Sequence, residues 1–140
     1  MKLTNKEFIK TIEKKYNFEK NPSVAVAVSG GPDSMSLLFL IHAFIKYKKG
    51  NLSALIVDHS IRNSSKEEAK YISNYLFKHK IKSQILSVDR NNVKKKSMSE
   101  ARKNRYNLLT DFCNKNKILH LFIAHHKEDN LETFLNRKIA

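Results

Sequence analysis

Ser29-Gly30-Gly31-Pro32-Asp33-Ser34 joins two apolar stretches and decides the fold of this chain. The stretch before it, Val24 to Val28, consists only of valine and alanine, which is typical of a short strand buried on both faces. The stretch after it, Met35 to Ile45, is too long for a strand and predicts a buried helix. The two glycines permit a tight turn between strand and helix, so that backbone N–H groups at the helix N-terminus can face a phosphate group.

The loop does not fit the common phosphate-binding motifs. No lysine follows Gly31, as the Walker A motif requires, and the spacing is not G-x-G-x-x-G. A carboxylate such as Asp33 is compatible with a polyphosphate when a cation lies between them, because Mg²⁺ binds one or two carboxylates together with phosphate oxygens. The alternative is an ordinary turn in which Asp33 or Ser34 caps the helix.

Apolar patterns in the rest of the chain predict strands that alternate with helices. A capping box, Thr4-x-x-Glu7, begins an N-terminal helix that stops at Asn21-Pro22. The other predicted strands cover residues 52–57, 83–88 and 118–124, and the other predicted helices cover residues 64–77, 97–115 and 127–139. The fold class is therefore α/β, a doubly wound parallel sheet with helices on both faces, in which ligands bind beyond the carboxyl ends of the strands.

Two of these segments carry specific expectations. The strand over residues 83–88 is short and polar at its start, so it is expected near the sheet edge, and residues 89–97 lack apolar periodicity and predict a loop. The last helix, over residues 127–139, is predicted because Leu131, Phe134, Leu135 and Ile139 fall on one helical face.

The composition restricts the class of protein. A chain of 140 residues is expected to form one domain, with residues 1–21 as a helix leading into it. Lysine and arginine number 27 against 13 acidic residues, a formal net charge of +14. This charge favours polyanionic ligands such as ATP and tRNA, or reflects a generally lysine-rich composition. No signal peptide is visible and the longest apolar stretch is too short to span a bilayer, so a cytoplasmic location is expected.

The single cysteine, Cys113, excludes a disulfide within the chain and a CxxC metal or redox pair. It follows Leu108, Leu109 and Phe112 on a predicted helix, so it is expected to be a small buried residue. His125 and His126 are adjacent in the sequence. They lack the i, i+4 spacing of a zinc-binding histidine pair, so a zinc site is not expected there.

Four segments, in their order along the chain, resemble the PP-loop (N-type) ATP pyrophosphatases and, within these, the tRNA(Ile)-lysidine synthetase family. The first, Ser29 to Ser34, is similar to the S-G-G-x-D-S loop and marks only the superfamily. The other three are Val57-Asp58-His59-Ser60-Ile61-Arg62, Glu100-Ala101-Arg102-Lys103-Asn104-Arg105-Tyr106 and Ala124-His125-His126-Lys127-Glu128-Asp129-Asn130-Leu131-Glu132-Thr133. Together they cover roughly residues 22–138 and are specific for the narrower family.

The resemblance implies ATP and Mg²⁺ as cofactors and a set of site residues. The implied nucleotide-binding residues are Ser29, Gly30, Gly31, Pro32, Asp33, Ser34, Ile56, Val57, Asp58, His59 and Arg62. The implied catalytic residues are Asp33, Asp129, Arg102 and Arg105, and Asp33 and Asp129 are the implied magnesium ligands.

Each of these assignments has a simpler alternative. Asp58 and His59 could form a turn, Arg102 and Arg105 could belong to a solvated basic helix face, and Asp129 could be a helix cap. Glu128 departs from the Asp or Asn of the family pattern, although relative to Asp it leaves the charge unchanged.

The resemblance also implies a reaction, the ligation of lysine to C2 of the wobble cytidine of tRNA(Ile) through an adenylated intermediate. The implied partners are tRNA(Ile) and free lysine. Two alternatives remain: another PP-loop enzyme of the tRNA-thiolation or amidotransfer type, and a remnant that binds nucleotide or RNA without turnover. The family continues past the last motif, and the helix expected at residues 127–139 has no glycine at its C-cap. The domain is therefore expected to be incomplete at its C-terminus, with a separate C-terminal fragment as one further candidate partner.

Overall fold

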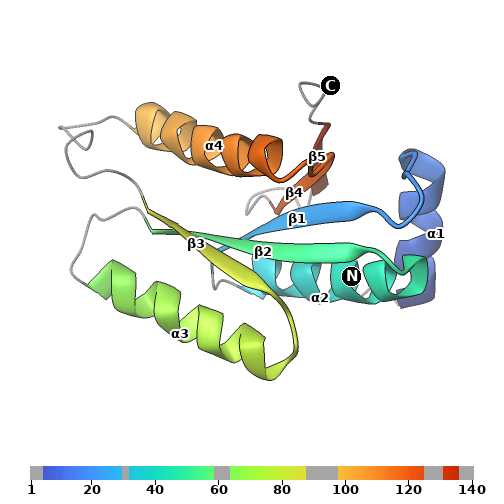
Figure 1. Ribbon diagram of the computed structural model, residues 1–140, viewed down its shortest axis with the longest axis horizontal. Helices are drawn as coiled ribbons and strands as arrows, with labels where there is room; N and C mark the ends of the chain where they lie inside the picture. Colours follow the sequence, from blue (N-terminus) through green and yellow to red (C-terminus); the bar gives the residue numbers. More distant parts are fainter. Residues whose placement is uncertain (1–4, 30–31, 59–63, 88–97, 125–130, 136–140) are drawn as a thin grey trace.

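The computed structural model describes residues 5–29, 32–58, 64–87, 98–124 and 131–135 (Figure 1). The elements, in chain order, are α1 (Asn5–Lys15), β1 (Ser23–Val28), α2 (Pro32–Lys48), β2 (Asn51–Asp58), α3 (Ser64–Lys78), β3 (Ser83–Ser87), α4 (Met98–Lys115), β4 (His120–Ala124) and β5 (Leu131–Leu135). The loop predicted at residues 89–97 lies outside the described residues.

The strands form a single five-stranded sheet in the order β3-β2-β1-β4-β5. The first four strands are parallel to one another, which confirms the predicted doubly wound arrangement, and β3 lies at an edge as expected. Each parallel strand must be followed by a connection that returns along the sheet, so the carboxyl ends of β1 to β4 meet at one edge. We call this the carboxyl edge, and the opposite one, where the same strands begin, the amino edge.

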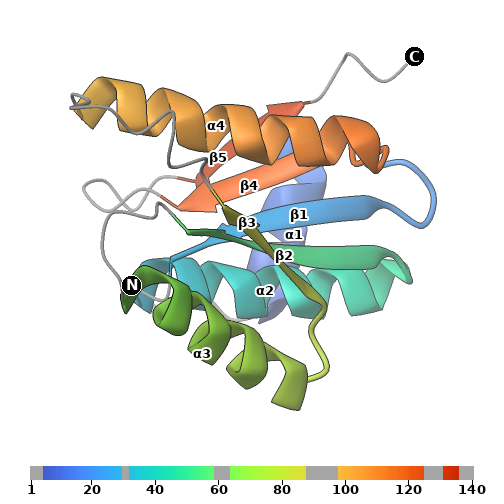
Figure 2. The ribbon, with the colours of Figure 1, turned by 60° about the vertical axis from the view of Figure 1, so that its left-hand side comes forward.

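Helices cover both faces of the sheet. Figures 1 and 2 show α4 on one face and α2 and α3 on the other. The two faces have separate apolar cores, and β1 contributes to both because successive side chains of a strand point to opposite faces. Its valines at 24, 26 and 28 pack into the core under α2 and α3, and its alanines at 25 and 27 pack against α4. This explains why the whole β1 sequence is apolar.

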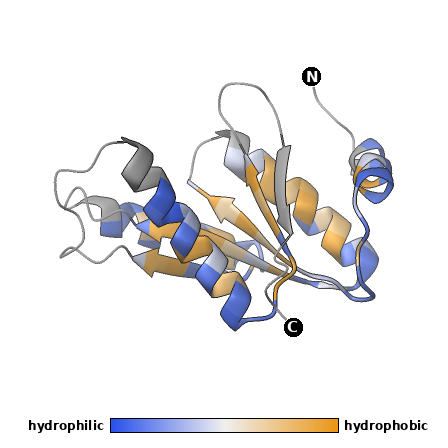
Figure 3. Ribbon diagram, turned by 90° about the horizontal axis from the view of Figure 1, so that it is seen from above, coloured by the Kyte–Doolittle hydropathy of each residue, from blue (hydrophilic) through white to orange (hydrophobic). Residues whose placement is uncertain are grey.

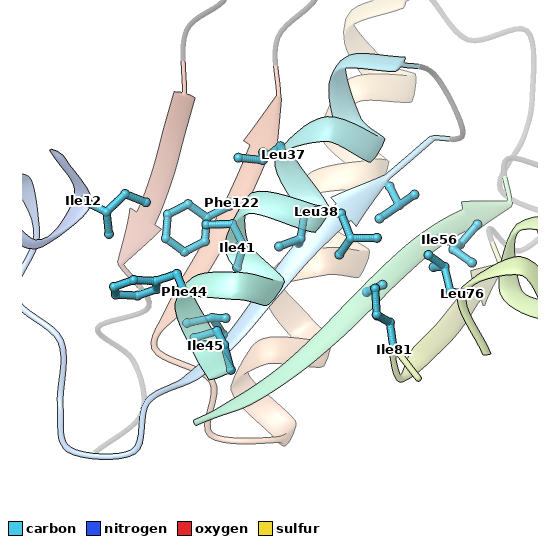
Figure 4. Close-up of a cluster of buried hydrophobic side chains, with 14 of the residues drawn as sticks. Ile12, Leu37, Leu38, Ile41, Phe44, Ile45, Ile56, Leu76, Ile81 and Phe122 are labelled. Carbon is cyan, nitrogen blue, oxygen red and sulfur yellow. The ribbon is translucent and has the colours of Figure 1, made fainter. Parts of the chain in front are cut away.

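The larger core lies between α1, α2, α3 and the sheet (Figure 4). Phe44 and Phe122 are fully buried at its centre, and Phe18 joins them, with its ring centroid 4.9 Å from that of Phe44. Ile12 attaches α1 to this cluster, and the Tyr16 ring meets Phe122 edge-on at 6.3 Å. α1 is therefore part of the core, but it ends at Lys15, whereas the helix was predicted to continue to Asn21-Pro22. Residues 16–22 instead lead from the helix to β1, with Tyr16 and Phe18 packed against the core.

Residues 131–135 form a strand, so the helix predicted over 127–139 is wrong for this stretch. β5 pairs antiparallel with β4, from His120↔Leu135 to Ala124↔Leu131. The spacing of Leu131, Phe134 and Leu135 fits a helix, but a short apolar run is ambiguous between helix and strand. Pairing with β4 determines that this stretch is a strand, because β5 supplies hydrogen-bond partners to the backbone groups along the outer side of β4. The remaining residues of the predicted helix, 127–130 and 136–139, lie outside the described residues.

A partly buried polar pair lies at the amino edge. His120, at the start of β4, is only 2% exposed, and its Nε2 lies 3.2 Å from Oε1 of Glu19. The Phe18 ring covers the imidazole, with the two ring centroids 4.5 Å apart. Burial lowers the pKa of His120, and the Glu19 carboxylate partly opposes this shift. The pair holds the segment after α1 against β4, far from the carboxyl edge.

Candidate functional site

A pair of serines closes the loop that connects β1 to α2. The backbone N–H of Ser29 donates to Oγ of Ser34 at 3.1 Å, and the two hydroxyl oxygens are 3.2 Å apart. Ser34 is buried in the first turn of α2, so the bond fixes the strand end against the helix start. Sequence reasoning assigned both serines to a phosphate loop but did not predict this direct contact. Gly30 and Gly31, between them, lie outside the described residues.

The serine loop stands where the strand order reverses. From β1 the chain moves to β2 and then β3 on one side, whereas β4 pairs with the other side of β1. The connection through α4 also crosses to the opposite face of the sheet from α2 and α3 (Figure 2). In open α/β sheets such a reversal leaves a crevice at the carboxyl ends of the strands, which is the usual ligand position.

The end of β2 adds a buried carboxylate beside this loop. Pairing between β1 and β2 ends at Val28↔Ile56, while β2 continues to pair with β3 through Asp58↔Ser87. The last two residues of β2 therefore extend past β1 at the carboxyl edge. Asp58 is 6% exposed there, and Val57 packs toward α4. The predicted group Ile56, Val57 and Asp58 thus occupies the strand next to the loop.

Arg105 brings a partly buried cation to α4, on the other face of the sheet. Its Nε is buried and has no hydrogen-bond partner among the residues that the structure describes. Burial lowers the pKa of its guanidinium, with a smaller opposing effect of Tyr106. A buried guanidinium N–H without a partner costs free energy that a bound anion would recover. Arg102 lies one turn earlier on the same helix, placed by its backbone.

The remaining predicted site residues are located only in part. Asp33 lies in the first turn of α2, placed by its backbone, and Pro32 is the first residue of that helix. His59, Arg62 and Asp129 lie outside the described residues. The structure therefore brings Ser29 and Ser34 into contact and sets Asp58 on the adjacent strand, but it does not test a contact between Asp33 and Asp129.

The described groups fit a magnesium-bound polyphosphate. The N-terminus of α2, a helix of 17 residues, presents backbone N–H groups and partial positive charge at the serine loop. Carboxylate oxygens near this end suit Mg²⁺, which takes one or two protein carboxylates and phosphate oxygens for the rest. Within the described ranges no three His, Cys, Asp or Glu side chains are grouped so that they could hold a metal ion.

Cys113 is buried in the core beneath α4, as predicted. It is 1% exposed, and burial raises the pKa of its thiol to about 12. The thiol therefore stays protonated near neutral pH and is a poor nucleophile. In the described part of the chain no helix has both the length and the apolar character needed to cross a membrane.

Comparison with known proteins identifies a matching family and several curated relatives that share one name. A model of the PP-loop domain family matches residues 4–139. The tRNA(Ile)-lysidine synthase of Wolbachia sp. subsp. Brugia malayi is 47% identical over 119 residues, which are 84% of this chain and 28% of the relative. The corresponding synthase of Orientia tsutsugamushi is 38% identical over 120 residues, 86% of this chain and 27% of the relative. The chain thus spans about a quarter of the length of these curated relatives.

Among solved structures, a U34-tRNA thiolase from Methanococcus maripaludis, described with its [4Fe-4S] cluster, has a similar fold. The TM-score is 0.73 at 21% identity, over 89% of this chain and 46% of the thiolase chain. At this identity the likeness concerns the fold alone. The family match covers nearly the whole sequence and includes the serine loop at the strand reversal. The chain belongs to the PP-loop domain family.

Proposed function

We propose that this chain is the ATP-binding part of a tRNA-modifying ligase, which joins lysine to C2 of the wobble cytidine of tRNA(Ile). The observation that carries the proposal is the closed serine loop at the strand reversal, in a chain 47% identical to a tRNA(Ile)-lysidine synthase. ATP, tRNA and free lysine are the proposed substrates, and their use together is consistent with a cytoplasmic reaction.

The proposed chemistry has two displacements. O2 of the cytidine attacks the α-phosphorus of ATP, an O–P bond forms, and pyrophosphate leaves. The lysine amine then attacks C2, a C–N bond forms, the C2–O bond breaks and AMP leaves, while the amine loses protons to solvent or a carboxylate. Both steps develop negative charge on phosphate oxygens, so the protein is expected to act by orientation and by placing positive groups nearby.

Each site residue has a proposed role in this scheme. Backbone N–H groups from Ser29 to Ser34 hold the pyrophosphate, and Asp33 with Asp129 binds Mg²⁺. Arg105, with Arg102, balances charge at the α-phosphate, which is supported by the buried Nε that lacks a partner in the described part of the chain. The segment from Ile56 to His59 would lie beside the nucleotide, and Arg62 would contact a phosphate.

Sulfur transfer to tRNA is the second candidate, because a tRNA thiolase shares the fold. Thiolation requires a cysteine that can carry sulfur or ligands for a cluster. This chain contains one cysteine, and burial raises its thiol pKa to about 12. The lysine-ligation proposal is therefore better supported by the residues of this chain.

We expect this chain to release pyrophosphate from ATP only when tRNA(Ile) is present, and to release AMP only when both tRNA(Ile) and lysine are present. Turnover is expected to be slow, since correct orientation of substrates supplies much of the rate and the match covers only 28% of the relative's length. The test uses ATP labelled at the α-phosphate, with the chain in excess over tRNA. A tRNA with uridine at the wobble position is the matched control. Formation of ADP and phosphate, or release of AMP without tRNA, would contradict the proposal.

A further inference from the structure

Lysine occupies the left-handed position after three of the helices. Lys49, Lys80 and Lys117 follow α2, α3 and α4 with φ values of 57°, 60° and 55°. In each case the next residue donates its backbone N–H to a carbonyl five residues earlier, as at Gly50 to Ile45 (3.0 Å), Ile81 to Leu76 (3.0 Å) and Ile118 to Cys113 (2.9 Å). This bond defines a Schellman motif, in which the left-handed residue is usually glycine.

A lysine at this position is unfavourable for the backbone, because a Cβ is disfavoured at positive φ. The chain nevertheless has lysine at all three sites. After α2 the next residue, Gly50, could adopt the left-handed conformation more easily, but a glycine is required at position 50 by the close approach of Pro22. A Cβ on Gly50 would collide with the carbonyl oxygen of Pro22, so the left-handed residue is Lys49. Repeated use of lysine in an unfavourable conformation points to a role for the side chains.

These lysines form a row along the amino edge. Lys80 and Lys82 precede β3, Lys49 precedes β2, Lys20 precedes β1 and Lys117 precedes β4, which is the order of the strands in the sheet. All five side chains are exposed. Neighbouring strands lie about 4.8 Å apart, so the row is roughly 15 Å long. Hydrogen bonds fix its backbone, from Asn21 Nδ2 to the Lys49 carbonyl (3.0 Å) and from Ala54 N–H to the Lys82 carbonyl (2.8 Å).

The surroundings of this lysine row are also basic. The last turns of the helices that end at this edge carry further lysines, at positions Lys14, Lys15, Lys46, Lys48, Lys78 and Lys115. Figure 3 shows α2 apolar along most of its length and hydrophilic at this end. Of the acidic residues near this edge, Glu13 lies 3.7 Å from Lys48, Glu19 lies 3.2 Å from the buried imidazole of His120, and Asp111 is exposed near the end of α4.

Two large aromatic side chains flank the lysine row. Tyr47, in the last turn of α2, is 61% exposed, and Phe77, in the last turn of α3, is 81% exposed. Exposed rings beside lysines suit a single-stranded or looped nucleic acid, because bases stack on the rings while the cations contact phosphates. An anionic membrane would also attract the lysines, but a nucleic acid uses both features at once, because its phosphates contact the cations while its bases stack on the rings.

We propose that the lysine row is a second RNA-binding surface, which holds the phosphate backbone of the tRNA at the amino edge. It is distinct from the candidate nucleotide site, because β2 is eight residues long and the two edges are therefore about 25 Å apart. The choice of tRNA as the RNA rests on the proposed function. The surface itself follows from the positive-φ lysines, their order across the sheet and the exposed rings.

The test replaces Lys49, Lys80 and Lys117 together, with glycine in one variant and glutamine in another. Glycine removes the charge and relieves the backbone, so this variant should melt at the same temperature or higher. We expect at least ~10-fold weaker tRNA binding for both variants, and a salt dependence (log K against log[salt]) that is shallower by about 2–3, since each lost phosphate contact removes roughly 0.7–0.9. The control carries glutamine at Lys66, Lys70 and Lys103, which are exposed helix positions away from the amino edge.

The outcomes separate this proposal from the proposed function. If both edge variants keep the wild-type tRNA affinity and salt slope, the lysine row is not an RNA-binding surface, and the proposed ligase reaction is unaffected. The same conclusion follows if the control loses as much tRNA affinity as the edge variants. Binding of anionic phospholipid vesicles in place of tRNA, lost in the edge variants, would identify the surface as a membrane site and contradict the proposal. ATP·Mg²⁺ affinity should be the same in both edge variants as in the wild type, because the nucleotide site lies at the other edge.

Discussion

Asp33→Ala is expected to lower the affinity of this chain for ATP in the presence of Mg²⁺ by at least ~10-fold. The reason is that Asp33 stands in the first turn of α2, next to the serine loop, where a carboxylate can share a cation with phosphate oxygens. Without Mg²⁺ the substitution should no longer lower the affinity for ATP. A carboxylate close to a triphosphate is then purely repulsive, so the variant should bind ATP as well as the wild type or better.

Calorimetric titration with ATP, in excess Mg²⁺ and again in excess chelator, measures both affinities. Asp111→Ala is the matched control, because it removes one exposed carboxylate from α4 at the end of the helix away from Arg105. The Asp33 variant should lose the gain that Mg²⁺ gives to ATP binding, while the control keeps it. An unchanged gain in the Asp33 variant would show that this residue only caps the helix.

Asp129→Asn is expected to slow the tRNA-dependent release of pyrophosphate by ~100-fold or more, since it removes a charge that we propose holds the cation at the reacting phosphate. Cys113→Ala is expected to leave the rate within about twofold, because the thiol is buried and its pKa is raised to about 12, so it takes no part in the reaction. Circular dichroism should show the wild-type fold in both variants.

These two substitutions also separate the competing functions. Loss of activity in Cys113→Ala, with the fold preserved, would replace lysine ligation with sulfur chemistry. A fully active Asp129→Asn variant would remove Asp129 from the set of reacting residues. The measurement is the single-turnover rate of pyrophosphate release with tRNA(Ile), lysine and ATP at saturating Mg²⁺.

Except for the end of α1, the strands and helices before residue 125 could be predicted from the sequence, because local pattern and tertiary role agree there. Val24 to Val28 is apolar throughout, and in the structure its valines and alanines fill two different cores. The stretch from Leu131 to Leu135 could not be predicted in this way. Its apolar spacing fits a helix equally well, and pairing with β4 determines its structure.

The sequence predicted at which strand ends the candidate site lies, but not the contacts between its side chains. Motifs at the ends of β1 and β2 placed Ser29, Ser34 and Asp58 at the carboxyl edge, where the structure has them. The contact between the two serine side chains and the buried Nε of Arg105 depend on how α2 and α4 pack, which no local pattern contains. The left-handed conformation of Lys49 was equally hidden, because the adjacent Gly50 is the residue that the sequence would favour for it.

A titration of the ¹⁵N-labelled chain with ATP and Mg²⁺, followed by amide chemical shifts, tests most directly whether the carboxyl edge binds the nucleotide. The amides of residues 29–34, apart from proline, and of Val57 and Asp58 should shift together as ATP·Mg²⁺ is added. Those of Lys49, Lys80 and Lys117, at the amino edge, should stay in place. Shifts confined to the amino edge, or none at all at saturating ATP·Mg²⁺, would contradict a nucleotide site at the serine loop.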